Sequence, residues 1–294
     1  PLIDGVPAFR RIGAAVEGAR RSVWVTVAFV DPDRPLPEAL GSVFDLLDRA
    51  AGRGLDVRVL FWRPSPETAG LGKVFAGTAT DRDLLRRRRS GWRARWDRLP
   101  GRACHHQKSW LVDAGQPTET AFVGGINLTS GIAGVPGHAG PDQVHDAYVE
   151  IAGPAARDVH HNFADRWNRA GEADGAWPEG DDAPLPLPGA PGVARGGALV
   201  QIQRTMPGGE RTILDQYLLA IAGARRTIYI ENQVPPAPPV AAALMAALAR
   251  GVRVVALVPA AVGRSPLPDH LAALCRHPGF TLAGLAGAAA VLFM

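Results

Sequence analysis

The segment His106-Gln107-Lys108-Ser109-Trp110-Leu111-Val112-Asp113 carries the most specific information in this 294-residue chain. Its apolar residues first alternate and then run together before an Asp, which predicts a short buried strand. Residues two apart on a strand share a face, so His106 and Lys108 are expected to point the same way. The chain has 32 Lys plus Arg but only two lysines, Lys73 and Lys108. A compact ammonium in place of the usual arginine, next to an imidazole, suits chemistry at a phosphate.

A second apolar strand is predicted downstream, at Ala121-Phe122-Val123-Gly124-Gly125-Ile126-Asn127. Glycines allow a backbone to approach a ligand closely, so Gly124 and Gly125 are candidate substrate-binding residues. The amide of Asn127 can donate a hydrogen bond to an anionic oxygen. The two strands together therefore predict one site for an anion.

The order and spacing of these residues resemble the signature of the phospholipase D superfamily: His-x-Lys, four residues, Asp, and then Gly-Gly-x-Asn. The stretch from His145 to Ala156 continues the resemblance, as do Asp158, Phe163, Arg166 and Trp167. The pattern is most similar to the lipid-cleaving branch, which carries two motifs in one chain. The resemblance implies a phosphodiesterase or phosphatidyltransferase that acts on phospholipid at a membrane surface and uses no cofactor.

In such an enzyme one histidine attacks phosphorus to give a phosphohistidine, and the histidine of the other motif protonates the leaving group. The resemblance therefore implies that His106 is the nucleophile and that Lys108 and Asn127 hold the phosphoryl oxygens. It implies that Asp146 orients His106 through the other ring nitrogen. Asp113 belongs to the catalytic set as the third letter of the motif. Its place seven residues after His106 predicts that it caps the turn instead of meeting substrate.

Two echoes in the same order predict a duplicated α/β unit. Residues 15–25 are echoed by residues 220–230, and residues 53–60 by residues 250–257. Each pair reads as a helix followed by a buried strand, and the crossover helices favour parallel pairing. The predicted fold is thus α/β: two phospholipase D-like units, each a mixed sheet flanked by helices, related by a pseudo-twofold axis.

The first unit, with the motif, is expected at residues 1–170, and a linker rich in Pro and Gly at residues 171–197. The second unit is expected at residues 198–294. Glu231, Asn232 and Gln233 end one of its strands, so they are predicted to line the cleft and bind substrate.

A second His-x-Lys motif would fall near position 303 if the second unit kept the spacing of the first. The chain given ends at Met294, and of its eight histidines only His106 has a lysine two positions later. The expectation is therefore that the second unit stops before its motif and that this chain carries half of the site. Such a chain is predicted to turn over slowly as a monomer.

Composition sets wider bounds. A net charge of +4 and a pI near 9.6 favour anionic partners without choosing among them. Two cysteines, Cys104 and Cys275, allow one disulfide or two free thiols. No run of 18 or more apolar residues predicts a transmembrane segment, and no signal peptide is visible, so a soluble or membrane-peripheral protein is expected, with the cytoplasm favoured. His105, His160 and His161 lack partners at metal spacing, so no metal site is predicted.

Three other functions remain open at this stage. A phospholipase D-like nuclease builds its site across a homodimer; the basic, tryptophan-containing tract from Arg82 to Arg102 favours it, and the length of the chain opposes it. The alternative for this tract is a solvated helix face whose tryptophans pack inward. The second rival is an inactive fragment that binds phosphate or membranes. The third is a lipid-synthesising transferase such as a cardiolipin synthase, although the amino-terminal membrane helices usual there are not seen. The oligomeric state is not predicted.

Overall fold

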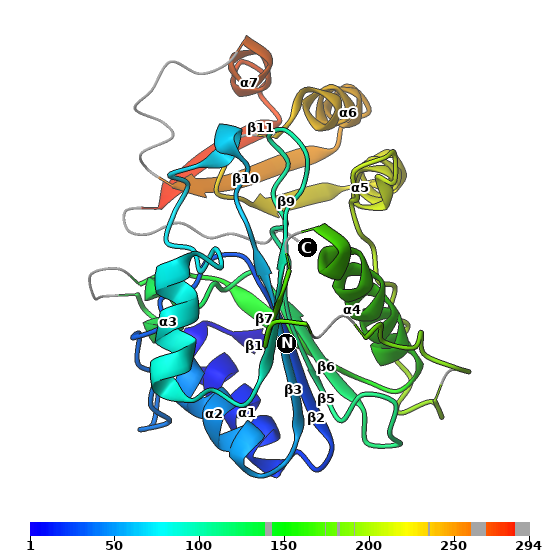
Figure 1. The fold of residues 1–294 in the computed structure, drawn as a ribbon. Coiled ribbons are helices and arrows are strands. Elements are labelled where there is room, and N and C mark those ends of the chain that lie inside the picture. The colour runs from blue at the N-terminus through cyan, green and yellow to red at the C-terminus, as the bar shows by residue number, and fades with distance from the viewer. Residues whose placement is uncertain are drawn as a thin grey trace.

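A computed structural model describes residues 1–138, 143–173, 175–180, 183–190, 192–234, 236–259 and 269–285. Within them lie two β-sheets, of eight and three strands, each with helices packed against it. Figure 1 shows the larger sheet with helices on both sides and the smaller sheet, from yellow to red, beyond one of its ends. The predicted α/β class with a large mixed sheet is confirmed.

The large sheet has the strand order β1-β7-β6-β5-β2-β3-β4-β8. Its strands are β1 (Leu2–Ile3), β2 (Ser22–Val27), β3 (Asp56–Trp62), β4 (Arg93–Asp97), β5 (Lys108–Val112), β6 (Thr120–Gly124), β7 (Ala147–Ala152) and β8 (Ala176–Trp177). β2, β3 and β4 are parallel, whereas β5 pairs antiparallel with β2 and continues as an antiparallel run through β6 and β7. The sheet is therefore mixed, and β5 lies near its middle.

Helices cover both faces of this sheet (Figure 1). On one face are α1 (Gly5–Gly18), α2 (Val43–Gly52) and α3 (Ala79–Arg88), and on the other is α4 (Pro154–Ala173). Two short 3-10 helices, η1 (Pro66–Thr68) and η2 (Ser130–Ala133), lie in loops. Ser42 and Thr78 start α2 and α3 with capping boxes, and Pro154 opens α4, where its missing N–H costs nothing.

Central strands are apolar on both sides because both faces are covered. All six residues of β2 are buried. Val23, Val25 and Val27 join the core under α1 to α3, whereas Trp24 packs with Phe163 and Trp167 of α4. The two cores hold the middle of the sheet, and with it β5, in a fixed position.

The second unit repeats the beginning of the first. Its elements are α5 (Thr212–Gly223), β9 (Thr227–Glu231), α6 (Pro238–Ala249), β10 (Arg253–Pro259), α7 (Asp269–Cys275) and β11 (Phe280–Leu285). The helix–strand order matches that of α1 to β4, and the strands are again parallel. Register is repeated as well: Val23 pairs with Val57 in the first unit, and the echoed Ile228 pairs with Val254 in the second.

The segment expected to be a linker packs on the first unit. α4 runs to Ala173, and β8 then adds an antiparallel edge strand to β4. Leu185 is buried in the core beneath α4, and Met206 is buried next to Arg166. Parts of the expected linker therefore pack against the first unit, because apolar side chains in this Pro-rich stretch contact α4. Residues 174, 181, 182 and 191 of the expected linker lie outside the described residues.

The structure also bears on the basic tract, the two cysteines and the question of membrane-spanning helices. In the basic tract, Trp92 and Trp96 are fully buried, which confirms that its tryptophans pack inward. Both cysteines are free thiols. None of the helices in the described ranges is both long and apolar enough to cross a membrane.

Candidate functional site

Most of the predicted site residues lie at one end of the large sheet, and Asp113 lies at the other. At the end with most of these residues, β2 ends and β5 begins, because β5 runs antiparallel to β2. Across the sheet, Lys108 pairs with Gly124, and Gly124 pairs with Tyr148. His106, Asn127 and Asp146 flank these paired positions in sequence. The carboxyl ends of parallel strands are the usual location of ligand sites in α/β folds.

His106 enters the site from the segment just before β5, because the strand begins at Lys108 and not at His106 as predicted. Its ring lies edge-on to Phe29, with ring centroids 5.4 Å apart. Burial, and then the charge of Lys108, lower the pKa of His106 to about 4. The imidazole is therefore neutral near pH 7, which is the form that can act as a nucleophile.

Lys108 is a buried cation, with 2% of its surface exposed. Its Nζ donates a hydrogen bond to the carbonyl oxygen of His106 at 2.6 Å, so the ammonium lies under the histidine backbone. Burial lowers the pKa of Lys108 to about 7, and the charges of Cys104 and Asp146 partly oppose this shift. An anion bound next to this amine would favour its protonated form.

Asp146 precedes β7 and is also buried. Burial raises the pKa of its carboxyl to about 7, against the hydrogen bond from the Ala147 N–H and the charge of Lys108. Its Oδ1 accepts from that N–H at 2.7 Å. Among the described residues no hydrogen bond joins Asp146 to His106, so the orientation of His106 by Asp146 stays a prediction. The electrostatic partner that the structure does provide is Lys108.

The side chain of Asn127 is oriented by the main chain. Its Oδ1 accepts a hydrogen bond from the N–H of Phe29 at 3.3 Å, which directs the amide nitrogen elsewhere as a donor. Gly124 was predicted to let the backbone approach a ligand, but the structure gives another reason for a glycine at this position. A Cβ on Gly124 would lie 2.3 Å from the carbonyl oxygen of Ala147, and Gly125 donates to that same oxygen. These glycines let β7 approach β6, and so bring Asp146 to the site.

Asp113 lies at the other end of β5, away from this cluster. Its Oδ1 accepts from the backbone N–H groups of Arg20, Arg21 and Ser22, at 2.9, 2.7 and 3.4 Å. It caps the start of β2, as predicted for a structural residue, and its carboxylate is occupied by that role.

The second unit contributes Glu231 to the edge of the site. Its Oε2 lies 3.5 Å from Nε2 of His145, the residue before Asp146. Asn232 instead forms a local turn: its Oδ1 accepts from the Gln233 N–H, and its own N–H donates to Leu257. Glu231 thus lies close to the site residues, whereas Asn232 and Gln233 stay predictions.

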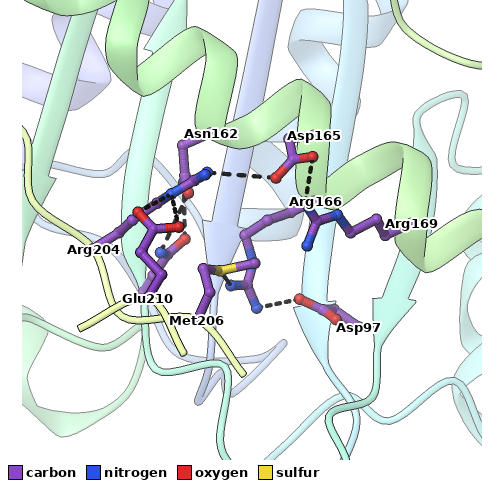
Figure 2. A network of polar contacts seen from close by, with 9 residues as sticks. Asp97, Asn162, Asp165, Arg166, Arg169, Arg204, Met206 and Glu210 are labelled. Carbon is purple, nitrogen blue, oxygen red and sulfur yellow. Dashed lines mark hydrogen bonds and ion pairs between the residues drawn. The ribbon is translucent and has the colours of Figure 1, made fainter. Parts of the chain in front are cut away.

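Behind the site, α4 and the following segment form the polar network of Figure 2. Arg166 binds Asp97 at the end of β4, and Asp97 Oδ2 lies 3.6 Å from Nδ1 of the buried His105. Arg204 joins Glu210 to Asp165 of α4. Arg166 thus ties α4 to the end of β4, and Asp97 lies close to His105, the residue that precedes His106.

Sequence reasoning missed Phe29, which contacts both His106 and the oxygen of Asn127, and it missed the pairing of Asp4 with His138 and His145. Phe29 follows a buried strand, which is a weak signal for a site. Asp4 is more than 130 residues from either histidine, so no local motif could have connected them.

The structure thus defines an α/β protein with an imidazole, a buried amine and an amide gathered at one edge of its mixed sheet. No family model matches the chain. It is 30% identical over 274 residues to a cardiolipin synthase A of Pseudomonas entomophila, covering 92% of this chain and 51% of that protein. It is 27% identical over 297 residues to phospholipase D alpha 4 of Arabidopsis thaliana, covering 79% of this chain and 39% of that protein.

Among solved structures, phosphatidylserine synthase of Haemophilus influenzae superposes with a TM-score of 0.53 at 12% identity, over 96% of this chain and 74% of that one. That likeness concerns the fold alone. The chain belongs to the phospholipase D superfamily. It spans about half the length of the cardiolipin synthases it matches.

Proposed function

We propose that this chain is a phospholipase D-type phosphodiesterase or phosphatidyltransferase that acts on phospholipid, and that its described residues supply one half of the active site. The observation that carries the proposal is the neutral imidazole of His106 beside the buried ammonium of Lys108, with the Asn127 amide at the same sheet edge. The names of the curated relatives, a cardiolipin synthase and a phospholipase D, support phospholipid as the substrate.

In the proposed mechanism a ring nitrogen of His106 attacks phosphorus, and the bond from phosphorus to the alcohol oxygen breaks. Lys108 and Asn127 stabilise the non-bridging oxygens as negative charge accumulates on them. The departing alkoxide takes a proton from an acid on the opposite side. Water or an alcohol then attacks the phosphohistidine and gives its proton to the conjugate base of that acid, while the bond between phosphorus and nitrogen breaks and the neutral imidazole is regenerated.

The strand pairing of the second unit supports the proposal that the described residues supply half of the active site. In the first unit, β2 pairs with β3 on one side and with the motif strand β5 on the other. Its counterpart β9 pairs with β10, and within the described residues its other edge carries no strand. Tyr229 of β9 is 61% exposed, whereas its counterpart Trp24 is covered by α4, so the second unit has an uncovered face in addition to this open edge. The edge of β9 is therefore a place for a strand equivalent to β5, which would bring the acid.

The rival nuclease has less support from the structure. The aromatic residues of its basic tract are buried, and Arg88 pairs with Asp45 and Asp48 of α2. Arg95 is buried and donates to the backbone of Trp167. The tryptophans and these two arginines are therefore taken up by packing and cannot stack on bases, whereas Arg86, Arg87 and Arg89 are exposed.

A substrate whose leaving group needs no proton tests the proposal. With short-chain phosphatidyl-p-nitrophenol, the chain should release a burst of nitrophenolate equal to the enzyme concentration and gain one phosphatidyl group by mass. Phosphatidylcholine should react about 10²–10⁴-fold more slowly, because its choline alkoxide requires the general acid. His106→Ala should abolish the burst, and His161→Ala, at an exposed position of α4, should retain it.

Two results would contradict the proposal: a burst that survives in His106→Ala, or a folded wild-type chain without one. Thymidine p-nitrophenyl phosphate tests the nuclease. Faster reaction with this nucleotide than with the lipid ester would replace phospholipid by nucleic acid as the substrate.

A further inference from the structure

Asp4, His138 and His145 converge at the first turn of α1, next to the site but outside the proposed mechanism. Asp4 Oδ1 lies 2.8 Å from Nε2 of His138 and 2.8 Å from Nδ1 of His145. The three potential ligand atoms all lie within 4.8 Å of one another. Two imidazoles and one carboxylate are a ligand set that borderline divalent metals prefer.

The conformation of Asp4 is unusual for a residue at this position. It is the N-cap of α1, where an Asp side chain normally accepts a backbone N–H of the first turn. Here it makes no capping hydrogen bond, and its φ is +66°, in the region that non-glycine residues rarely adopt. Its buried carboxylate is turned toward the two histidines instead. The Asp4 carboxylate therefore contacts the two imidazoles and does not cap α1.

The second ring nitrogen of His145 gives an independent indication. Metal-bound histidines almost always donate the other ring N–H to a carboxylate, carbonyl or water, which fixes the tautomer. While Nδ1 of His145 faces Asp4, its Nε2 lies 3.5 Å from Oε2 of Glu231 in the second unit. This places a carboxylate–histidine pair behind the cluster.

The main chain holds the three segments together without a metal. The Asp4 N–H donates to the carbonyl oxygen of Asp146 at 2.7 Å, and the Val6 N–H donates to that of Gly134 at 2.9 Å. A Zn²⁺ ion at about 2.0–2.2 Å from each ligand would set neighbouring ligand atoms about 3.4 Å apart, so only a small movement is needed. The histidine side chains are 29% and 32% exposed, which leaves a path for the ion and room for a water ligand.

We propose that Asp4, His138 and His145 form a binding site for one Zn²⁺ or similar divalent transition metal ion, with Glu231 as the outer partner of His145. The ion would join the start of α1 to the segment before β7 and, through Glu231, to the second unit. This departs from the expectation of no metal site, which considered other histidines. The proposal does not depend on the proposed lipid chemistry, because its test measures metal alone.

The test uses untagged protein stripped with EDTA and titrated calorimetrically with Zn²⁺. Wild type should bind one equivalent, and Co²⁺ in its place should give visible absorption bands of a four- or five-coordinate ion. Asp4→Asn, which keeps an oxygen acceptor but removes the charge, should weaken binding at least about 100-fold. Glu231→Gln should weaken it by about 10-fold, the lower end of the range for a group that orients a metal-bound histidine.

Two controls separate this site from other ligands. His161→Gln changes an exposed histidine on α4, and the Cys104→Ser/Cys275→Ser double variant removes both thiols; both should bind like wild type. If Asp4→Asn fails to fold, His138→Gln, in a partly exposed loop, gives the same test. Absence of binding by the folded wild type, or unchanged affinity in Asp4→Asn or His138→Gln, would show that the cluster is only a hydrogen-bonded one.

Discussion

Replacement of Lys108 by Met should stabilise the fold while it removes the proposed phosphate-binding charge. The lysine is almost fully buried, and burial is the main cause that lowers its pKa from an ordinary 10.5 to about 7. At 1.36 kcal/mol for each pKa unit, the buried ammonium costs on the order of 4 kcal/mol of folding free energy near pH 7. Met has a similar length and no charge to desolvate.

The effect of Lys108 on the free energy of unfolding should depend on pH. The folded-state pKa of Lys108 lies below the unfolded-state value, so the unfolded chain binds more protons between about pH 7 and 10.5. Wild-type stability should therefore rise with pH across this window as far as Lys108 determines it, and Lys108→Met should lack that rise. Loss of the cation also leaves Asp146 without its partner, but the pKa of that carboxyl is already about 7, so it can become neutral at small cost.

The assay is urea unfolding of both proteins at about pH 7 and about pH 9.5. We expect Lys108→Met to be more stable by roughly 2–4 kcal/mol at the lower pH and by about 1 kcal/mol at the higher one. The other lysine of the chain is a matched control: Lys73 is 59% exposed and pairs with Asp31, so Lys73→Met should change stability by less than about 1 kcal/mol. A Lys108→Met variant that is less stable than wild type near pH 7 would refute the reasoning.

Two further substitutions test the supports of the site. Asp113→Ala leaves three backbone N–H groups without their acceptor, and should lower the unfolding free energy by roughly 2–4 kcal/mol; a change below about 1 kcal/mol would mean that water replaces the carboxylate. Gly124→Ala places a methyl group 2.3 Å from the Ala147 carbonyl oxygen, and should cost roughly 2–3 kcal/mol in chemical denaturation. The same change at Gly18, where nothing lies within 4 Å of the added Cβ, should be neutral or slightly stabilising, and equal effects at both positions would contradict the packing argument.

The sequence was most informative where chemistry and strand geometry coincide. The rarity of lysine made Lys108 conspicuous. β5 begins at Lys108, and the lysine amine donates to the main-chain carbonyl of His106, so a common strand face for the two side chains stays a prediction. The duplicated echoes predicted the order of helices and strands in both units, because helix periodicity and buried strands are local properties.

Other features depend on contacts that no local pattern reveals. The orientation of His106 by Asp146 stays a prediction, and the structure adds a partner that no local pattern indicated: the charge of Asp146, just before β7, acts on Lys108. The glycines of β6 were expected to face a ligand, yet Gly124 is required by the approach of a neighbouring strand. Residues 171–197 have the composition of a linker, and only the tertiary structure shows the apolar surface of α4 that receives Leu185.

Burial sets the ionisation states of the three titratable residues at the site, and these states suit the binding of an anion. Burial shifts the pKa of Lys108, Asp146 and His106 toward their neutral forms, at a cost to stability for each group that must be charged. A neutral histidine is what nucleophilic attack requires, so for His106 this shift is useful. For Lys108 the same burial leaves the amine ready to take up a proton near pH 7, and an incoming phosphate diester would supply the charge that stabilises it. The proposed chemistry therefore depends on the burial of these side chains as much as on which residues they are.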